Sequence, residues 1–223
     1  MVHGDSVCPV QRIVQVRKVA VMVRAIAVDY GGVLVKSHSE PGNIDQIAAA
    51  VGLTGEQLKQ GVYGRGRALW NQTKVGWMPE SEHWRQVQKA LELPMDKIEW
   101  IKRRLFDEVT LHVEFVRYIE GLQGRYSLAL VSNAIPSFTD TWRRLGFLDL
   151  FPVVINSSRV GVAKPSSEIF HLAAQRLGVE PADCVFVDDQ IVHIKAAMGA
   201  GFRGVHYAGA AGAIAQIDAL RGC

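Results

Sequence analysis

The chain has 223 residues, of which 48% are hydrophobic and 21% are charged, and its formal net charge is +3. This length and apolar content exclude a disordered chain and provide enough material for one α/β core with an inserted subdomain. The acids and bases are nearly balanced, and the clusters Lys102–Arg104 and Arg143–Arg144 lie in helical patterns typical of solvated faces, so we expect no nucleic-acid partner.

The first 22 residues form an N-terminal extension. Its pattern is compatible with a tail, an extra strand or an extra helix. Basic residues interrupt its apolar stretches, so it contains neither a signal-peptide core nor a membrane span. The three cysteines, Cys8, Cys184 and Cys223, are odd in number and far apart, which indicates no disulfide or zinc framework. We therefore expect a cytoplasmic protein with no membrane partner.

The segment Arg24–Val35 places one carboxylate, Asp29, at the end of an apolar strand, directly before Gly31 and Gly32. A buried parallel strand reads as a continuous apolar run, and ligands of open α/β sheets bind beyond the carboxyl ends of such strands. Two glycines allow a sharp turn whose peptide groups can approach an anion. Aspartate-glycine pairs also mark ordinary turns, so this stretch alone leaves both interpretations open.

The long segment that follows, about residues 39–112, has only helical patterns. We predict a helix pair over Pro41–Val51 and Thr54–Val62, broken at Gly52, and two further helices over Ser81–Leu91 and Asp96–Phe106. In the third helix Trp84, Val87 and Leu91 are spaced to face inward. The segment therefore predicts an all-helical subdomain.

After residue 112, strands near 127–131, 152–155, 184–187 and 203–207 alternate with helices near 136–146, 166–178, 190–200 and 210–221. With the first strand this predicts a five-stranded, doubly wound parallel sheet with right-handed crossovers. The fold class is α/β, Rossmann-like, with residues 23–38 and 113–223 as the core and residues 39–112 as the insertion.

Polar side chains follow three of the later elements. Ser132–Asn133 ends one strand and offers groups suited to phosphate oxygens, and Lys164 is restrained by the proline that follows it. Asp188 and Asp189 follow another apolar strand, where two like charges repel each other unless a cation is bound. Asp189 alone could be a helix cap, but that role leaves Asp188 unexplained.

The order Asp29, Ser132, Lys164, Asp188–Asp189, each just past a predicted strand, resembles the haloacid dehalogenase superfamily of hydrolases over residues 23–221. The resemblance implies that Asp29 is the nucleophile, that Ser132 binds phosphate and that Lys164 neutralises charge. It also implies that Asp188 and Asp189 hold Mg²⁺ with Asp29 and the backbone of Gly31. We expect Gly32 and Asn133 to contact the substrate phosphate. This chemistry suits an aspartyl-phosphate mechanism.

Two positions depart from the pattern of this superfamily. Most of its phosphatases carry a second aspartate, a general acid, two residues after the nucleophile, where this chain has Gly31. Subgroups with an Asp-x-Gly-Gly motif share this feature and include phosphatases of small sugar phosphates. His38 and Glu40 are candidates to replace the missing acid. The second departure is His193, where the superfamily usually has asparagine; imidazole can donate the same hydrogen bond.

In this superfamily a helical insertion at this point is a cap that covers the active site and carries substrate contacts. Within it, the segment Tyr63–Trp70 mixes arginine, glycine and aromatic residues, so Arg65 and Arg67 are candidates for an anion-binding rim. The alternative interpretation is that the aromatic residues belong to the hydrophobic core of the insertion and that both arginines are solvated.

The function expected from the sequence is Mg²⁺-dependent hydrolysis of a small soluble phosphate ester by a monomer or homodimer. Two alternatives stay open. One is a 2-haloacid dehalogenase, which Asp188–Asp189 disfavour because they would place two unscreened carboxylates beside a carboxylate substrate. The other is a phosphate-binding or regulatory protein with little turnover, because Gly31 lacks an acid. Fold and motifs do not determine the leaving group.

Overall fold

The computed structural model describes residues 22–36 and 42–222. His38 and Glu40, Cys8 and Cys223, and nearly all of the N-terminal extension lie outside these residues. Within the described part of the chain, no helix has the length and apolar character needed to cross a membrane.

A five-stranded parallel sheet forms the core, in the order β3-β2-β1-β4-β5, and confirms the predicted doubly wound fold. The strands are β1 (Ala25–Val28), β2 (Ser127–Ser132), β3 (Val153–Asn156), β4 (Cys184–Asp188) and β5 (Arg203–His206). The first strand lies at the centre of the sheet, so the residue after it has neighbours on both sides.

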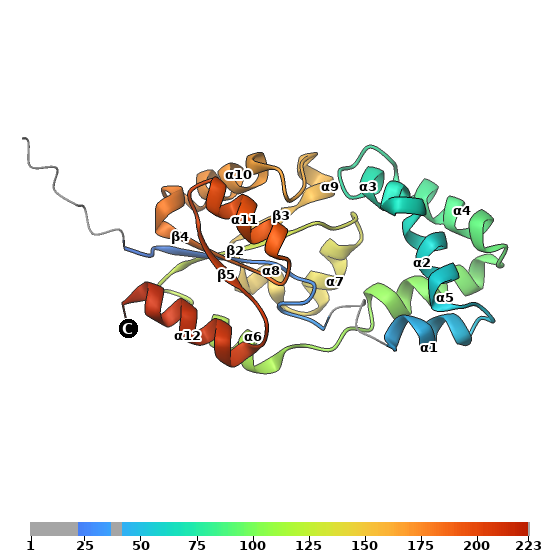
Figure 1. Ribbon diagram of the computed structural model, residues 1–223, viewed down its shortest axis with the longest axis horizontal. Helices are drawn as coiled ribbons and strands as arrows, with labels where there is room; N and C mark the ends of the chain where they lie inside the picture. The colour runs from blue at the N-terminus through green and yellow to red at the C-terminus, as the bar shows by residue number, and fades with distance from the viewer. Residues whose placement is uncertain (1–21, 37–41, 223) are drawn as a thin grey trace, which may run out of the picture.

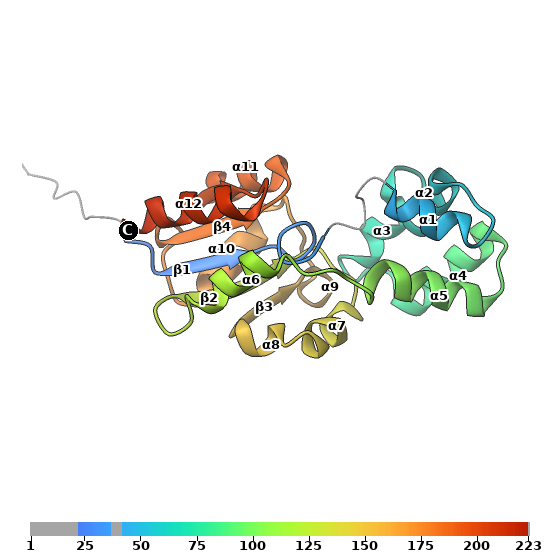
Figure 2. The same ribbon diagram turned by 90° about the horizontal axis from the view of Figure 1, so that it is seen from below.

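Alternate residues of each strand enter different hydrophobic layers, as the two-residue period of a strand requires. Ala25 and Ala27 pack with helices α10 (Ser167–Leu177) and α11 (Ile191–Gly199) on one face of the sheet. Ile26 and Val28 enter the layer on the other face. That face is covered by α6 (Val113–Glu120), α7 (Phe138–Arg144), α8 (Phe147–Leu150) and α12 (Ala210–Arg221), as Figures 1 and 2 show.

The insertion is helical and lies apart from the sheet, beyond the carboxyl ends of the strands (Figure 2). It consists of α1 (Asn43–Ala49), α2 (Gly55–Tyr63), α3 (Ala68–Thr73), α4 (Glu80–Leu91) and α5 (Met95–Phe106), with a short 3₁₀ turn over Arg65–Arg67. The predicted inward face of α4 is correct, because Trp84, Val87 and Leu91 are buried. We call this helical unit the cap.

Several short helices did not follow from the sequence pattern. The predicted helix near 136–146 forms only over α7, and Gly146, with a φ of 77°, separates it from α8. The pattern also missed α3, α6, α8 and α9 (Ser157–Val160). Three of them have six residues or fewer, and tertiary packing rather than helical periodicity determines such short segments.

Candidate active site

The strand order brings the predicted motifs together at one edge of the sheet. Asp29 follows β1, while Ser132 and Asp188 are the last residues of the flanking strands β2 and β4. All three residues are buried, with exposed fractions of 5%, 3% and 0%. Three of the residues singled out in the sequence therefore lie at the same edge of the sheet.

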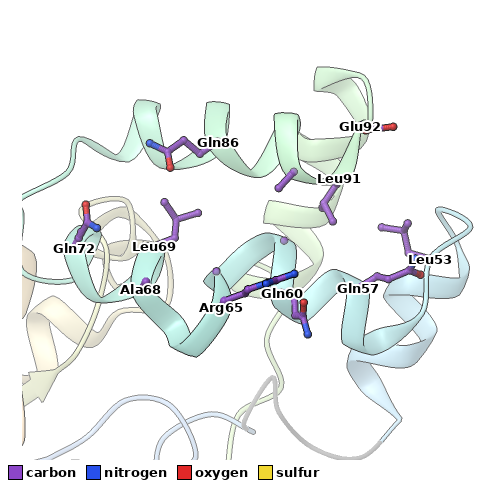
Figure 3. A pocket seen from close by; sticks show the side chains of 13 residues that line it. Leu53, Gln57, Gln60, Arg65, Ala68, Leu69, Gln72, Gln86, Leu91 and Glu92 are labelled. Carbon is purple, nitrogen blue, oxygen red and sulfur yellow. The ribbon is translucent and has the colours of Figure 1, made fainter.

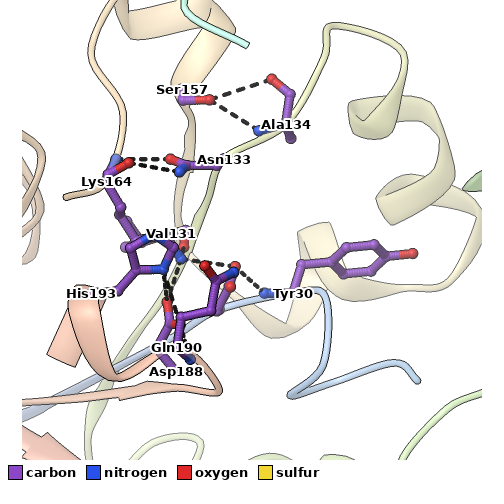
Figure 4. Close-up of polar contacts among 10 residues, drawn as sticks. Tyr30, Val131, Asn133, Ala134, Ser157, Lys164, Asp188, Gln190 and His193 are labelled. Carbon is purple, nitrogen blue, oxygen red and sulfur yellow. Dashed lines mark hydrogen bonds and ion pairs between the residues drawn. The ribbon is translucent and has the colours of Figure 1, made fainter. Parts of the chain in front are cut away.

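Lys164 joins the two sides of the cluster. Its Nζ lies 2.9 Å from Asp29 Oδ1. The same Nζ lies 2.6 Å from Asp188 Oδ2 and donates to the carbonyl oxygen of Val131 at 3.0 Å (Figure 4). An ammonium group has three donors, and all three are used. The lysine is buried, and breaking such a pair by removing one partner leaves an uncompensated buried charge.

The pKa values reflect this arrangement. Burial raises the pKa of Asp29 to about 7, against the attraction of Lys164. Burial also acts to raise the pKa of Asp188, but Lys164 and His193 outweigh it and hold that pKa below its ordinary value. Burial and the charge of Asp188 raise the pKa of Asp189. The cluster thus holds more negative charge than its one lysine offsets.

The Asn133 side chain pairs with the backbone of Lys164. Its Nδ2 donates to the carbonyl oxygen of Lys164 and its Oδ1 accepts from the Lys164 amide, both at 2.8 Å (Figure 4). Asn133 also lines the cavity, but these two bonds use its amide to fix the Lys164 backbone. The side chain therefore positions the lysine.

His193 holds the second carboxylate. Its Nδ1 lies 3.0 Å from both oxygens of Asp188, so the proton must be on Nδ1, because the carboxylate can only accept. This matches the expectation that histidine replaces the usual asparagine as a donor. Asp188 Oδ1 also accepts from the Gln190 amide at 2.8 Å. Gln190, not Asp189, is the N-cap position of α11, and no side-chain capping bond is made at that position.

The two glycines after Asp29 differ in their surroundings. A Cβ atom on Gly32 would lie 2.5 Å from Asp189 Oδ2, and the φ of Gly32 is 80°, so only glycine fits there. A Cβ atom on Gly31 would meet nothing within 4 Å. Gly31 lines the cavity beside Asp29, so a side chain at this position would enter open space.

A cavity of about 200 Å³ lies between this cluster and the cap. The core side of the cavity contains Asp29, Ser132, Asp189 and His193. The cap provides the opposite wall, which we call the roof: Tyr63, Arg67, Trp70, Asn71, Lys74 and Phe106.

The expected anion-binding residues divide between two places. Arg67 belongs to the roof, whereas Arg65 lines a separate, larger hollow between α2, α3 and α4 within the cap (Figure 3). Sequence reasoning missed Asn71 and Lys74 in the roof. Their spacing from Arg67, four and seven residues, is the only local signal, and it does not show which face of α3 meets the core.

Hydrogen bonds and aromatic contacts hold the cap on the core. The Ser157 hydroxyl donates to the carbonyl oxygen of Lys74 at 2.5 Å and accepts from the Ala134 amide at 2.9 Å. Glu80 of the cap accepts from the Ser137 amide at 2.8 Å. These bonds place the Lys74 end of α3 over the loop that follows β2.

The donor set fits a divalent cation. Asp29, Asp188 and His193 bring potential ligand atoms within 4.8 Å of one another. Asp189 Oδ1 is buried and has no hydrogen-bond partner among the described residues, which a cation would satisfy. Magnesium prefers oxygen ligands, so Asp29, Asp188, Asp189 and the carbonyl group of Gly31 are suited to hold it.

A family model for haloacid dehalogenase-like hydrolases matches residues 23–201. The chain belongs to this family. Fructose-1-phosphate phosphatase of Escherichia coli is 29% identical over 136 residues, which cover 56% of this chain and 72% of that protein. Several other curated relatives are matched over less than a third of their own length.

Solved structures of this family have the same fold. A family enzyme of Bacteroides thetaiotaomicron, in complex with magnesium and inorganic phosphate, aligns with a TM-score of 0.68 at 17% identity over 82% of this chain and 93% of that chain. A 2-haloacid dehalogenase of Pseudomonas syringae aligns with a TM-score of 0.59 at 20% identity over 83% and 86% of the two chains. The fold is therefore shared with a family enzyme that binds magnesium and phosphate and with a 2-haloacid dehalogenase.

Proposed function

We propose that the chain is a Mg²⁺-dependent phosphatase that hydrolyses a small phosphate monoester through an aspartyl-phosphate intermediate on Asp29. The observation that carries the proposal is a buried nucleophile candidate at the floor of a cavity, flanked by one lysine and by Asp188 and Asp189. The phosphatase activity of the E. coli relative and the magnesium and phosphate bound by the B. thetaiotaomicron enzyme support it.

The two oxygens of Asp29 have different surroundings. Oδ1 accepts from the Tyr30 amide at 2.7 Å and lies 2.9 Å from Lys164 Nζ. These contacts fix the carboxylate and leave Oδ2 to attack phosphorus. The Asp29–phosphorus bond forms as the bond from phosphorus to the leaving oxygen breaks, and water then cleaves the acyl-phosphate.

Lys164 stays next to the reacting carboxylate throughout and offsets the charge that develops on the phosphoryl oxygens. A bound Mg²⁺ would supply further charge neutralisation at the same oxygens. Ser132 ends β2 inside the cavity, where its hydroxyl can donate to a phosphoryl oxygen, and Asn133 and His193 keep Lys164 and Asp188 in position. The cap limits access of bulk water to the acyl-phosphate.

The dehalogenase alternative has one specific observation in its favour, the fold shared with the P. syringae enzyme. One experiment separates the two. Release of phosphate from p-nitrophenyl phosphate and of chloride from 2-chloropropionate is measured with Mg²⁺ and after EDTA treatment. The proposal predicts Mg²⁺-dependent phosphate release and no chloride release. Metal-independent chloride release without phosphatase activity would overturn it.

A further inference from the structure

The roof of the cavity carries two positive charges. Arg67 and Lys74 flank α3 and line the cavity with Asn71, which lies four residues after the arginine and three before the lysine. Asn71 and Lys74 share one face of the helix at this spacing, whereas Arg67, the N-cap residue, has a left-handed backbone and reaches the cavity from the turn before the helix. α3 and the residues that flank it therefore present an arginine, an amide and a lysine to the same cavity.

Neither cation has an ion-pair partner among the described residues. The guanidinium of Arg67 lies over the Tyr63 ring, 5.0 Å from its centroid, and no carboxylate of the described cap residues lines the cavity. Burial, together with the charge of Arg67, lowers the pKa of Lys74. Two like charges next to each other are unfavourable, and an anion bound between them would relieve the repulsion.

The direction of the reaction connects this pair to the leaving group. Phosphoryl transfer places the nucleophile and the leaving oxygen in line on opposite sides of phosphorus. Asp29 lies on the core side of the cavity, so the leaving group of a bound ester points toward the roof. The cavity volume of about 200 Å³ is below the roughly 300–1,000 Å³ of common ligand pockets, which favours a short leaving group.

We propose that Arg67 and Lys74 bind a carboxylate at the end of a short leaving group, so that the preferred substrates are small phosphate esters of hydroxy acids. A carboxylate is small enough for this cavity, and a guanidinium can bind it through two parallel hydrogen bonds. Asn71 supplies a further donor on the same face. This inference rests on the proposed phosphatase function, which determines where the leaving group lies.

The test uses two phosphonates that cannot be hydrolysed: 3-phosphonopropionate, which ends in a carboxylate, and 3-hydroxypropylphosphonate, which ends in a hydroxyl group. Isothermal titration calorimetry measures the Kd of each for the wild-type protein in the presence of Mg²⁺. Charge-assisted hydrogen bonds predict that the carboxylate compound binds at least about 10-fold more tightly. Hydrolysis of p-nitrophenyl phosphate is measured on the same preparation.

Three variants locate the effect. Arg67→Met and Lys74→Met are each expected to reduce the preference for the carboxylate by roughly 10-fold. Arg65→Met is the matched control. It removes the same charge two positions earlier in the chain, from a side chain that lines the other hollow of the cap, and it should leave the preference for the carboxylate intact. Circular dichroism spectra check that each variant is folded.

These experiments distinguish a failure of the carboxylate subsite from a failure of the proposed phosphatase function. If p-nitrophenyl phosphate is hydrolysed but the two phosphonates bind equally, or neither binds, the carboxylate subsite is wrong and the phosphatase proposal stands. Equal weakening of both phosphonates in Arg67→Met and Lys74→Met would mean that the roof binds the reacting phosphate, and would also overturn the inference. Selective binding of the carboxylate compound by a protein without phosphatase activity would support the subsite and refute the proposed function.

Discussion

A Cβ atom on Gly32 would lie 2.5 Å from Asp189 Oδ2, so the loop after β1 is packed against the acidic end of β4 with no room for a side chain. This contact links the nucleophile loop to the carboxylate whose other oxygen, Oδ1, is buried without a partner among the described residues. The glycine thus allows two segments that are far apart in sequence to form one site.

Gly32→Ala is therefore expected to destabilise the protein and to disturb the site. The positive φ of Gly32 alone costs alanine about 1–2 kcal/mol, and the contact with Asp189 adds to this. Gly31→Ala is the matched control, because its Cβ meets nothing within 4 Å, and its effect should be below about 1 kcal/mol. Urea denaturation measures both. Equal stability of the two variants would contradict the packing described here.

Binding of Mg²⁺ should raise the Tm, because a ligand that binds only the native state stabilises it. Asp189→Ala should abolish this increase. Asp188 is a poorer choice for the test, since its removal also leaves Lys164 without its closest ion-pair partner. Asp140→Ala, which removes an exposed carboxylate of α7, is the control and should keep the full increase. A metal response that survives in Asp189→Ala would exclude this residue as a ligand.

The buried His83 of α4 makes the cap sensitive to acid. Burial lowers the pKa of His83 to about 4, from an ordinary value of 6.5. The unfolded chain therefore binds a proton that the folded chain does not, and stability is lost as the pH falls below about 6.5 toward 4. Between pH 7 and pH 5 this group should contribute a loss of about 2 kcal/mol.

His83→Gln tests this assignment, because glutamine does not titrate and can still contact Thr73, whose Oγ1 lies 2.9 Å from His83 Nδ1. Urea denaturation at pH 7 and pH 5 gives the loss of unfolding free energy for both proteins. The variant should lose about 2 kcal/mol less than the wild type. Identical losses would show that His83 is not responsible.

Gly31 tests whether the chain is an active enzyme without the usual acid. We expect the wild type to cleave alkyl phosphates at rates comparable to activated esters, with the proton supplied by another group, the substrate or water. Gly31→Asp should then gain less than about 10-fold on an alkyl phosphate. A gain of roughly 10²–10⁴, together with a wild type that cleaves only p-nitrophenyl phosphate, would identify a phosphate-binding protein with little turnover.

The sheet and the core side of the site could be predicted because both depend on local patterns in the sequence. An apolar run of four to six residues that ends in Asp29, Ser132 or Asp188 indicates a buried strand and places its polar end at one edge of the sheet. The roof could not be predicted in the same way. Lys74 lines the same cavity as Asp29, and the bonds of Ser157 and Ser137 that hold the cap there join residues more than 50 positions apart.

The hydrogen-bond partners of individual side chains could not be predicted from the sequence either. The motif brings Asn133 near the phosphate site, but its pairing with the Lys164 backbone depends on the path of a loop 31 residues later in the chain. Arg65 and Arg67 are the same residue type in the same segment, so the sequence does not distinguish them. A left-handed turn at Gly66 and Arg67 directs them to different cavities. Such conformations are uncommon for arginine and leave no signal in a hydrophobic pattern.

Covalent trapping tests the central proposal most directly. Wild-type protein that is turning over ³²P-labelled p-nitrophenyl phosphate with Mg²⁺ is quenched in acid, and the precipitated protein is counted before and after hydroxylamine, which cleaves acyl phosphates. The proposal predicts hydroxylamine-labile label on the peptide that contains Asp29, and neither label nor turnover in Asp29→Asn. Turnover by Asp29→Asn at the wild-type rate, or label on another residue, would contradict it.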